Sequence, residues 1–230
     1  MKKTVLTFVM SVMACVAMAE ERYVVEQENN SDRSYKECVN GKWFVGAGAG
    51  LQYYIGDHNR QAKIKDILSP AMDVYAGRWI NAVCGARLGV QGYRIKGLTN
   101  GNHFGDNPYT TGVEYIAKNG DPCEKQEFDY INAHADFMVN LTQLFKGHAA
   151  VLSVNVTPYV GLGWAGIMNK PHNNSWTVNF GIYTTYRLAE HWDVVLDVHS
   201  AVVDDSFDGD NGERKGEAIL GGNIGFSYRF

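Results

Sequence analysis

The stretch "KWFVGAGAGLQYYI", residues 42–55, alternates between two kinds of side chain. One set of alternate positions is apolar, and the other holds glycine, glutamine and aromatic residues. The apolar set comprises Trp43, Val45, Ala47, Ala49, Leu51, Tyr53 and Ile55. Because successive side chains of a β-strand point to opposite faces of a sheet, this period of two predicts a strand with one apolar face and one face of mostly small or polar groups.

Seven more segments of the chain alternate in the same way. They cover residues 70–80, 83–93, 129–141, 153–164, 176–188, 192–202 and 219–230. The resulting number of strands is even, and their connections alternate between short and long along the chain. Short turns at one end, long loops at the other and both chain ends on the short-turn side are the plan of an outer-membrane barrel.

A soluble eight-stranded barrel, such as a lipocalin, also alternates, with its apolar face inward. The lysines argue against that alternative, because none lies inside a predicted strand and only Lys42 stands at the edge of one. The polar face is instead rich in glycine, which weakens a strand that faces water. The pattern therefore favours an all-β fold, an eight-stranded antiparallel up-and-down transmembrane β-barrel.

The tryptophans agree with a membrane barrel, because all of them fall near strand ends as in the aromatic girdles of such proteins. The short-turn end has Trp43, Trp79 and Trp192, and the long-loop end has Trp164 and Trp176. Trp79 is an exception, because the alternation predicts that its side chain points inward and that of Arg78 outward. A bulge or the edge of the bilayer would accommodate this exception.

The N-terminus has the features of a secretory signal peptide. Lys2 and Lys3 precede the apolar stretch 5–16, and "AMA" at residues 17–19 is a cleavage site. A lipoprotein signal at Cys15 is disfavoured, because Met13 stands where a small residue is expected. We therefore expect a signal peptide at residues 1–19, a polar periplasmic lead at 20–41 and the barrel domain at 42–230. The location that follows is the outer membrane of a Gram-negative-type bacterium.

Several segments resemble the barrel domain of OmpA-type outer-membrane proteins. Among them are "FVGAGAGLQYYIGDHNR" (44–60), "HADFMVNLTQLF" (134–145), "PYVGLGWA" (158–165) and "WDVVLDVHSA" (192–201). The resemblance covers residues 42–230. Many members of that family carry a peptidoglycan-binding domain after the barrel, whereas this chain stops at Phe230. Cell-wall tethering is therefore not expected from the resemblance.

The last residues, "NIGFSYRF", resemble the C-terminal signal that the barrel-assembly machinery recognises. The pattern polar-x-Gly-x-x-aromatic-x-aromatic fits at Asn223, Gly225, Tyr228 and Phe230. This resemblance implies the assembly machinery as a partner. As the eighth strand, the segment is expected to close the barrel against residues 42–55.

Charged residues on the lumen face form a candidate site. Strand phase and direction place Arg87, Asp136 and Asp197 near mid-depth, and they place Arg187, Asp193 and Arg229 near the periplasmic end. An eight-stranded barrel has room only for its own side chains, and buried charges must pair or stay hydrated. A structural polar network is the favoured interpretation. A gate that opens when a pair rearranges is the alternative.

The cysteines offer no framework of disulfides and no zinc motif. After the signal peptide the chain has Cys38, Cys84 and Cys123. Cys38 and Cys84 fall at the periplasmic end, so a disulfide between them is topologically allowed, whereas Cys123 lies in the long outer loop. Isolated thiols are the other interpretation.

No pattern indicates catalysis, a cofactor or a bound metal. The histidines are scattered, and no catalytic motif such as G-x-S-x-G is present. The loop from Asp204 opens like a calcium loop, through Ser206, Asp208 and Gly209, but Lys215 stands where the bidentate glutamate is required. We therefore expect a protein that is not an enzyme. The formal net charge of −4 also argues against nucleic acid as a partner.

The long polar loop at residues 96–127 is the best candidate for surface interactions, because loops on a rigid scaffold often carry function. It contains the aromatic residues Phe104, Tyr109 and Tyr115. The expected function is a structural or surface-interaction role in the outer membrane, with lipid and envelope or surface proteins as partners. A narrow or gated pore for ions and small solutes, or a barrel subunit of a larger outer-membrane complex, remains an alternative.

Overall fold

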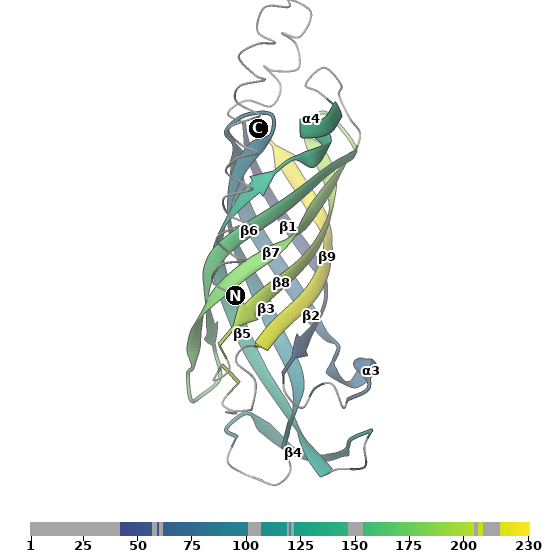
Figure 1. The fold of residues 1–230 in the computed structure, drawn as a ribbon, viewed down its shortest axis with the longest axis vertical. Helices are drawn as coiled ribbons and strands as arrows, with labels where there is room; N and C mark the ends of the chain where they lie inside the picture. Colours follow the sequence, from purple (N-terminus) through teal and green to yellow (C-terminus); the bar gives the residue numbers. More distant parts are fainter. Residues whose placement is uncertain are drawn as a thin grey trace, which may run out of the picture.

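The computed structural model describes residues 42–56, 59, 62–100, 107–118, 120, 122–146, 154–204, 207–208 and 217–230. The expected signal peptide and periplasmic lead lie outside these residues and stay predictions. Eight strands form the barrel (Figure 1). They are β1 (Trp43–Ile55), β2 (Ser69–Trp79), β3 (Cys84–Asn100), β5 (Pro122–Val139), β6 (Val154–Ile167), β7 (Asn174–Arg187), β8 (Trp192–Val203) and β9 (Glu217–Arg229).

The sheet closes on itself, because each barrel strand pairs with its two neighbours in an antiparallel ladder. The seam joins β1 to β9, from Phe44 opposite Arg229 to Ile55 opposite Ala218. The backbone N–H of Phe230 adds a hydrogen bond of 3.0 Å to the carbonyl of Trp43. Closure pairs both edges of each barrel strand, so no backbone N–H or C=O of an open strand edge is exposed to the hydrocarbon of a membrane. The predicted fold and its closing strand are confirmed.

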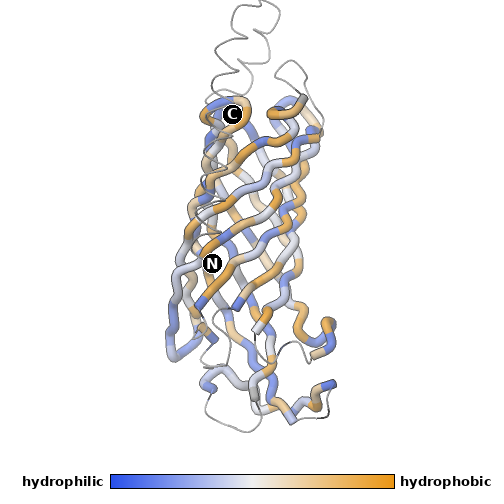
Figure 2. Tube along the Cα trace, in the orientation of Figure 1, coloured by the Kyte–Doolittle hydropathy of each residue, from blue (hydrophilic) through white to orange (hydrophobic). Residues whose placement is uncertain are grey.

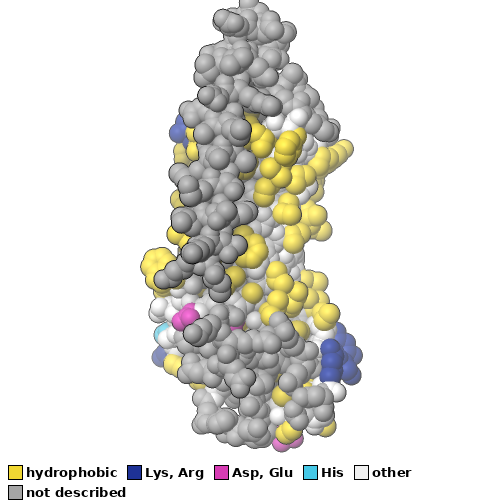
Figure 3. Space-filling view, in the orientation of Figure 1, with side chains coloured by type: hydrophobic (Ala, Val, Ile, Leu, Met, Phe, Trp, Pro, Cys, Tyr) yellow, Lys and Arg dark blue, Asp and Glu magenta, His cyan; other side chains and the backbone are white. Residues whose placement is uncertain are grey.

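The two faces of the wall have the predicted character. Hydrophobic and hydrophilic residues alternate along the strands in Figure 2, and hydrophobic side chains gather on the wall in Figure 3. Exposed apolar residues such as Leu51, Val74 and Leu88 point outward, whereas Gln52 and Asn132 are buried in the lumen. Among the described residues, no helix is long and apolar enough to cross a membrane.

The tryptophans follow the expected girdles with one correction. Trp164 and Trp176 stand opposite each other on β6 and β7, and both are exposed. Trp79, in contrast, is only 9% exposed and packs on the ring of Phe44 at 6.0 Å inside the lumen. It does not belong to the girdle, because its phase on β2 points inward.

Two short helices lie at opposite ends of the barrel (Figure 1). α4 (Leu141–Lys146) follows β5 at the end where the C-terminus lies. α3 (Ile64–Ile67) lies in the connection between β1 and β2 at the other end. The end with α4 and the short turns is the periplasmic one, by the rule that outer-membrane barrels keep their short turns there.

Most of the described residues in the predicted loop at 96–127 are strand, which corrects the sequence analysis. β3 and β5 stay paired beyond the barrel as far as Asn100 opposite Cys123, and β4 (Thr110–Ile116) pairs with the outer part of β5. Outside the membrane both faces of a strand can meet water, so the apolar stripe that marks a spanning strand disappears. Arg94, in this outer part of β3, forms ion pairs with Glu127 and Asp129 on β5.

Candidate functional site

A guanidinium lies at the centre of the lumen between two carboxylates. Arg87 Nη2 is 2.8 Å from Asp136 Oδ2, and Arg87 Nη1 is 2.8 Å from Asp197 Oδ2. The side chains of Arg87 and Asp136 are 2% and 0% exposed. Because the three residues stand on β3, β5 and β8, they tie distant parts of the wall together. The structure thus brings together the charges that strand phase placed at mid-depth.

Three tyrosines surround this guanidinium, and the sequence analysis did not single them out. Arg87 Cζ lies 4.3 Å from the ring centroid of Tyr159. The corresponding distances to Tyr75 and Tyr183 are 5.1 and 5.4 Å. The Tyr159 hydroxyl also donates to Asp197 Oδ1 at 2.8 Å. Cation–π contacts of this kind strengthen when water is excluded. All three tyrosines occupy lumen-facing positions of their strands. Strand phase, combined with the depth of each position, could therefore have predicted that they lie near Arg87.

Neighbouring polar groups complete the same level of the lumen. His134 Nδ1 lies 2.9 Å from Asp136 Oδ1, and the Asn223 amide donates to Asp73 Oδ1 at 2.6 Å. All four side chains belong to buried residues. Side chains therefore fill the barrel at mid-depth, as expected for eight strands.

Glycines on adjacent strands make room for these large lumen groups. A Cβ on Gly89 would clash with the ring of His134, and one on Gly161 would clash with Asp136. The same relation holds between Gly46 and the ring of Tyr75. At these three positions, a glycine on the lumen face leaves the space that a large side chain of the lumen occupies.

An apolar cluster fills the lumen at the extracellular mouth. It consists of Tyr54, Ile95, Tyr109, Phe128, Tyr130, Ala165, Ile167, Ala201, Val203, Phe207 and Ile219. Phe207, from the connection between β8 and β9, is fully buried, and its ring lies 6.1 Å from that of Phe128. Tyr109, from the connection before β4, lies 5.2 Å from the same ring. Two extracellular connections thus insert into the barrel and cover its outer mouth.

Polar contacts hold these connections in place. Gln126 Nε2 donates to Asp208 Oδ2 at 2.9 Å, and Asn107 Nδ2 donates to Gln126 Oε1 at 2.9 Å. Burial and the nearby Asp208 carboxylate raise the pKa of the Tyr109 hydroxyl. In the loop tested for calcium, Ser206 and Gly209 lie outside the described residues. Across the described part of the chain, no group of three or more His, Cys, Asp or Glu side chains forms that could hold a metal ion.

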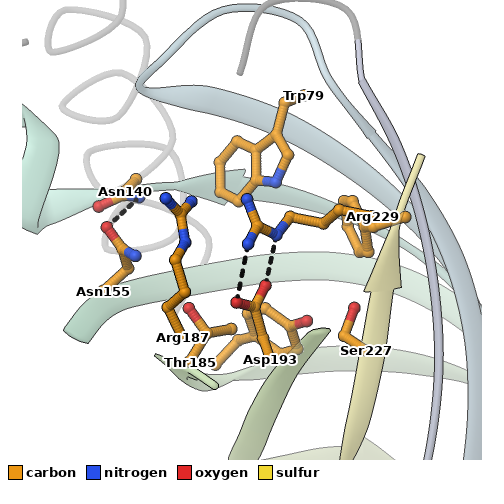
Figure 4. Close-up of a pocket in the computed structure, with 10 residues that line it drawn as sticks. Trp79, Asn140, Asn155, Thr185, Arg187, Asp193, Ser227 and Arg229 are labelled. Atoms are coloured by element: carbon orange, nitrogen blue, oxygen red, sulfur yellow. Dashed lines mark hydrogen bonds and ion pairs between the residues drawn. The ribbon is translucent and has the colours of Figure 1, made fainter. Parts of the chain in front are cut away.

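The periplasmic mouth contains a small pocket of about 40 Å³ (Figure 4). Its lining comprises Phe44, Trp79, Asn140, Asn155, Tyr183, Thr185, Arg187, Asp193, Ser227 and Arg229. Arg229 binds Asp193 through two contacts, with Nε 2.7 Å from Oδ2 and Nη2 3.1 Å from Oδ1. Arg187 lines the same pocket, but its Nε is buried and has no hydrogen-bond partner within the described ranges. The structure therefore pairs two of the three charges predicted at this end and leaves Arg187 out.

The residues of the C-terminal pattern divide between the two faces of β9. Asn223 faces the lumen, and Gly225 lets the backbone of β1 approach closely at the seam. Tyr228 and Phe230 lie on the outer side, with their ring centroids 5.2 Å apart. A role in assembly stays a prediction.

The predicted disulfide between Cys38 and Cys84 stays a prediction. Cys84 is buried beside Val83 and Val139 at the periplasmic end, whereas Cys38 lies outside the described part of the chain. Cys123 is buried at the opposite end, as the sequence analysis placed it.

Comparison with known proteins supports the fold. No family model matches the chain. Outer membrane protein 40 of Porphyromonas gingivalis is 22% identical over 201 residues, which cover 82% of this chain and 48% of that protein. The chain thus spans about half the length of this relative.

Two solved structures are similar in fold. The outer membrane protein OprG from Pseudomonas aeruginosa has a TM-score of 0.51 at 9% identity, over 84% of this chain and 97% of that one. Neisserial surface protein A has a TM-score of 0.50 at 11% identity, over 82% and 97%. The expected location agrees with the closed barrel and with the names of the two similar outer-membrane proteins. These likenesses also agree with the OmpA-type resemblance at the level of fold.

Proposed function

We propose that this protein is a non-enzymatic outer-membrane barrel that presents a rigid extracellular platform for surface interactions. The platform consists of α3, β4, the part of β3 that follows Tyr93 and the part of β5 that precedes Tyr130. The observation that carries the proposal is the continuous pairing of β3 and β5 out to Asn100 opposite Cys123. A paired ladder holds its backbone by hydrogen bonds, unlike the polar loop expected from the sequence.

A small core of its own stabilises the platform. Ala62, Ile67, Leu98, Ala117 and Cys123 are buried together, with Tyr53 and Tyr115 packed against them. The Tyr115 hydroxyl donates to Asp66 Oδ2 at 3.1 Å and accepts from the backbone N–H of Lys63 at 3.2 Å. The connection between β1 and β2 is thereby fixed to the ribbon of β3, β4 and β5.

The platform also exposes apolar side chains. Val113 and Ile116 on β4 and Ile64 on α3 are exposed, and Ile116 is 76% exposed. Exposed apolar residues that form a contiguous patch are typical of contact sites for other proteins. An envelope or surface protein is therefore the expected partner.

Co-purification tests this role. The ribbon would be shortened by replacing residues 95–128 with a two-residue turn, and a control chain would be altered only in the connection at residues 168–173. After gentle detergent extraction, the wild type and the control should retain the same partner, and the shortened chain should lose it. A partner that stays bound to the shortened chain would instead favour the alternative of a barrel subunit in a larger complex.

The lumen network of Arg87, Asp136 and Asp197, with Arg187, Asp193 and Arg229 below it, is proposed to be structural. Support comes from the filling of the barrel at mid-depth and at the extracellular mouth. Single-channel recording of the purified protein in planar bilayers is the test. We expect no steady conductance. Steady openings of ionic size would favour the narrow or gated pore.

A further inference from the structure

We propose that the periplasmic mouth binds an oxyanion, a carboxylate or a phosphate group, with Arg187 as its main ligand. The pocket of Figure 4 lies at the end of the barrel opposite the platform. The proposal is therefore independent of the surface role, and either can fail without the other.

The charges of the pocket are not balanced by its lining. Arg187 and Arg229 contribute two guanidinium groups, and Asp193 contributes the single carboxylate. Strand register places Arg187 directly opposite Asp193 on β7 and β8. Both oxygens of that carboxylate are nevertheless bound by Arg229. The lining therefore has one formal positive charge in excess. The Asp193 carboxylate lies within electrostatic reach of Arg187, but its hydrogen bonds come from Arg229.

One nitrogen of the Arg187 guanidinium also lacks a hydrogen-bond acceptor within the described residues, although the residue as a whole is half-buried. Its Nε is buried and has no partner in the described part of the chain. A buried charged donor without an acceptor is costly, so such groups normally bind a counter-charge. Arg229, two strands away on β9, shows the contrast, because its Nε lies 2.7 Å from a carboxylate oxygen of Asp193.

Neighbouring groups would assist a bound anion. Asn155 Oδ1 accepts from Asn140 Nδ2 at 3.3 Å and from Gln143 Nε2 at 3.4 Å. These bonds leave the amide nitrogen of Asn155 on the side of Arg187, as Figure 4 shows. An N–H donor and a guanidinium on two neighbouring strands therefore face one small space.

The size of the pocket limits the ligand. A volume of about 40 Å³ is far below the roughly 300–1,000 Å³ of sites that hold whole small molecules, so only a small oxyanion group enters it. The planar fork of arginine matches the two oxygens of a carboxylate or phosphate. The ligand is therefore either a small free oxyanion or the oxyanion end of a larger molecule. That molecule is either soluble or a lipid whose phosphate reaches the mouth.

The test uses the barrel in a non-ionic detergent at constant ionic strength. Sodium phosphate and sodium acetate are added in turn while the Nε–H signals of the arginines are followed by NMR. A third sample holds the barrel in nanodiscs with phosphatidylglycerol, compared with phosphatidylcholine alone. We expect the Arg187 signal to move in at least one sample while that of Arg87 stays in place. The responding sample identifies the source of the oxyanion.

Two variants make the test specific. Arg187→Gln lacks the Arg187 signal, so this variant is compared with the wild type by the heat stabilisation that each anion gives. It should need about tenfold more anion, or more, for the same stabilisation, because a hydrogen-bonded charge is lost. Arg78→Gln is the control, since Arg78 lies at the same end on the outer face, 5.6 Å from the ring of Trp43. It should respond like the wild type. The proposal is overturned if the Arg187 signal moves in none of the samples, or if anions stabilise Arg187→Gln against heat as much as they stabilise the wild type.

Discussion

Arg87 on β3 and Asp136 on β5 stand directly opposite each other, and their ion pair is withdrawn from water inside the barrel. Asp197 binds the other side of the same guanidinium from β8. An ion pair on one edge of a sheet would fix only two strands. The contact between Arg87 and Asp197 instead spans the lumen from β3 to β8, so the geometry of the network is coupled to the shape of the whole barrel.

Arg87→Gln should therefore destabilise the barrel strongly. Removing one partner of a buried ion pair leaves charge without compensation, at a cost of about 3–5 kcal/mol. Urea unfolding of the refolded protein in lipid vesicles would measure the loss. Arg94→Gln is the matched control, because its ion pairs with Glu127 and Asp129 are largely exposed and contribute little. Equal losses in the two variants would contradict a structural role for the Arg87 network.

Gly161→Ala should also destabilise the barrel, although it adds only one methyl group. The new Cβ would clash with the Asp136 carboxylate and with the carbonyl of Ala135. Overpacking of this kind costs about 1–3 kcal/mol. The control is Gly222→Ala, where the added carbon meets only the carbonyl of Asp197 at 3.9 Å. If the unfolding midpoints of both variants match that of the wild type, close packing between strand glycines and lumen groups is not required.

Phe207→Ala should loosen the extracellular mouth without unfolding the barrel. The ring is fully buried against Phe128, and loss of such packing costs about 3–5 kcal/mol. Because Phe207 lies in a connection, the effect should appear as faster hydrogen exchange at the outer ends of β5 and β9. Phe145→Ala, on the exposed side of α4, serves as the control. Unchanged exchange at the outer strand ends would show that Phe207 does not hold the mouth closed.

The alternation of side chains predicted the barrel because a wall between lipid and a polar lumen imposes that pattern on each spanning strand. It also placed Arg87, Asp136 and Asp197 at one depth. Strand phase could not choose between Arg187 and Arg229 as the partner of Asp193, because both lie on the lumen face of strands next to β8. That choice depends on side-chain geometry. Alternation predicts which face of the strand a side chain lies on, but not which neighbour it contacts.

The outer end of the protein was harder to predict for a different reason. Beyond the membrane a strand need not be apolar on either face, so the extension of β3 and β5 resembles a polar loop. Phe207 was equally hidden, since its burial depends on contacts with Phe128 and Tyr109, which are distant in sequence. The cue that was available is that an isolated phenylalanine in an acidic loop often has an apolar partner elsewhere.

Deletion of Phe230 should reduce insertion into the outer membrane in cells while leaving refolding in vitro largely intact. Phe230 is exposed on the outer face at the end of the seam, and the assembly signal proposed here ends on this ring. Phe226→Ala is the matched control, because Phe226 is also exposed on β9 but lies outside the pattern of Asn223, Gly225, Tyr228 and Phe230. The readouts are the amount of barrel in the outer-membrane fraction and the yield of refolding into pure lipid vesicles. A truncated chain that also refolds poorly in vesicles would point to a weakened seam, since Phe230 donates its backbone N–H to Trp43 there. A truncated chain that inserts normally in cells would rule out the signal, because recognition of the terminal aromatic residue is what the proposal requires.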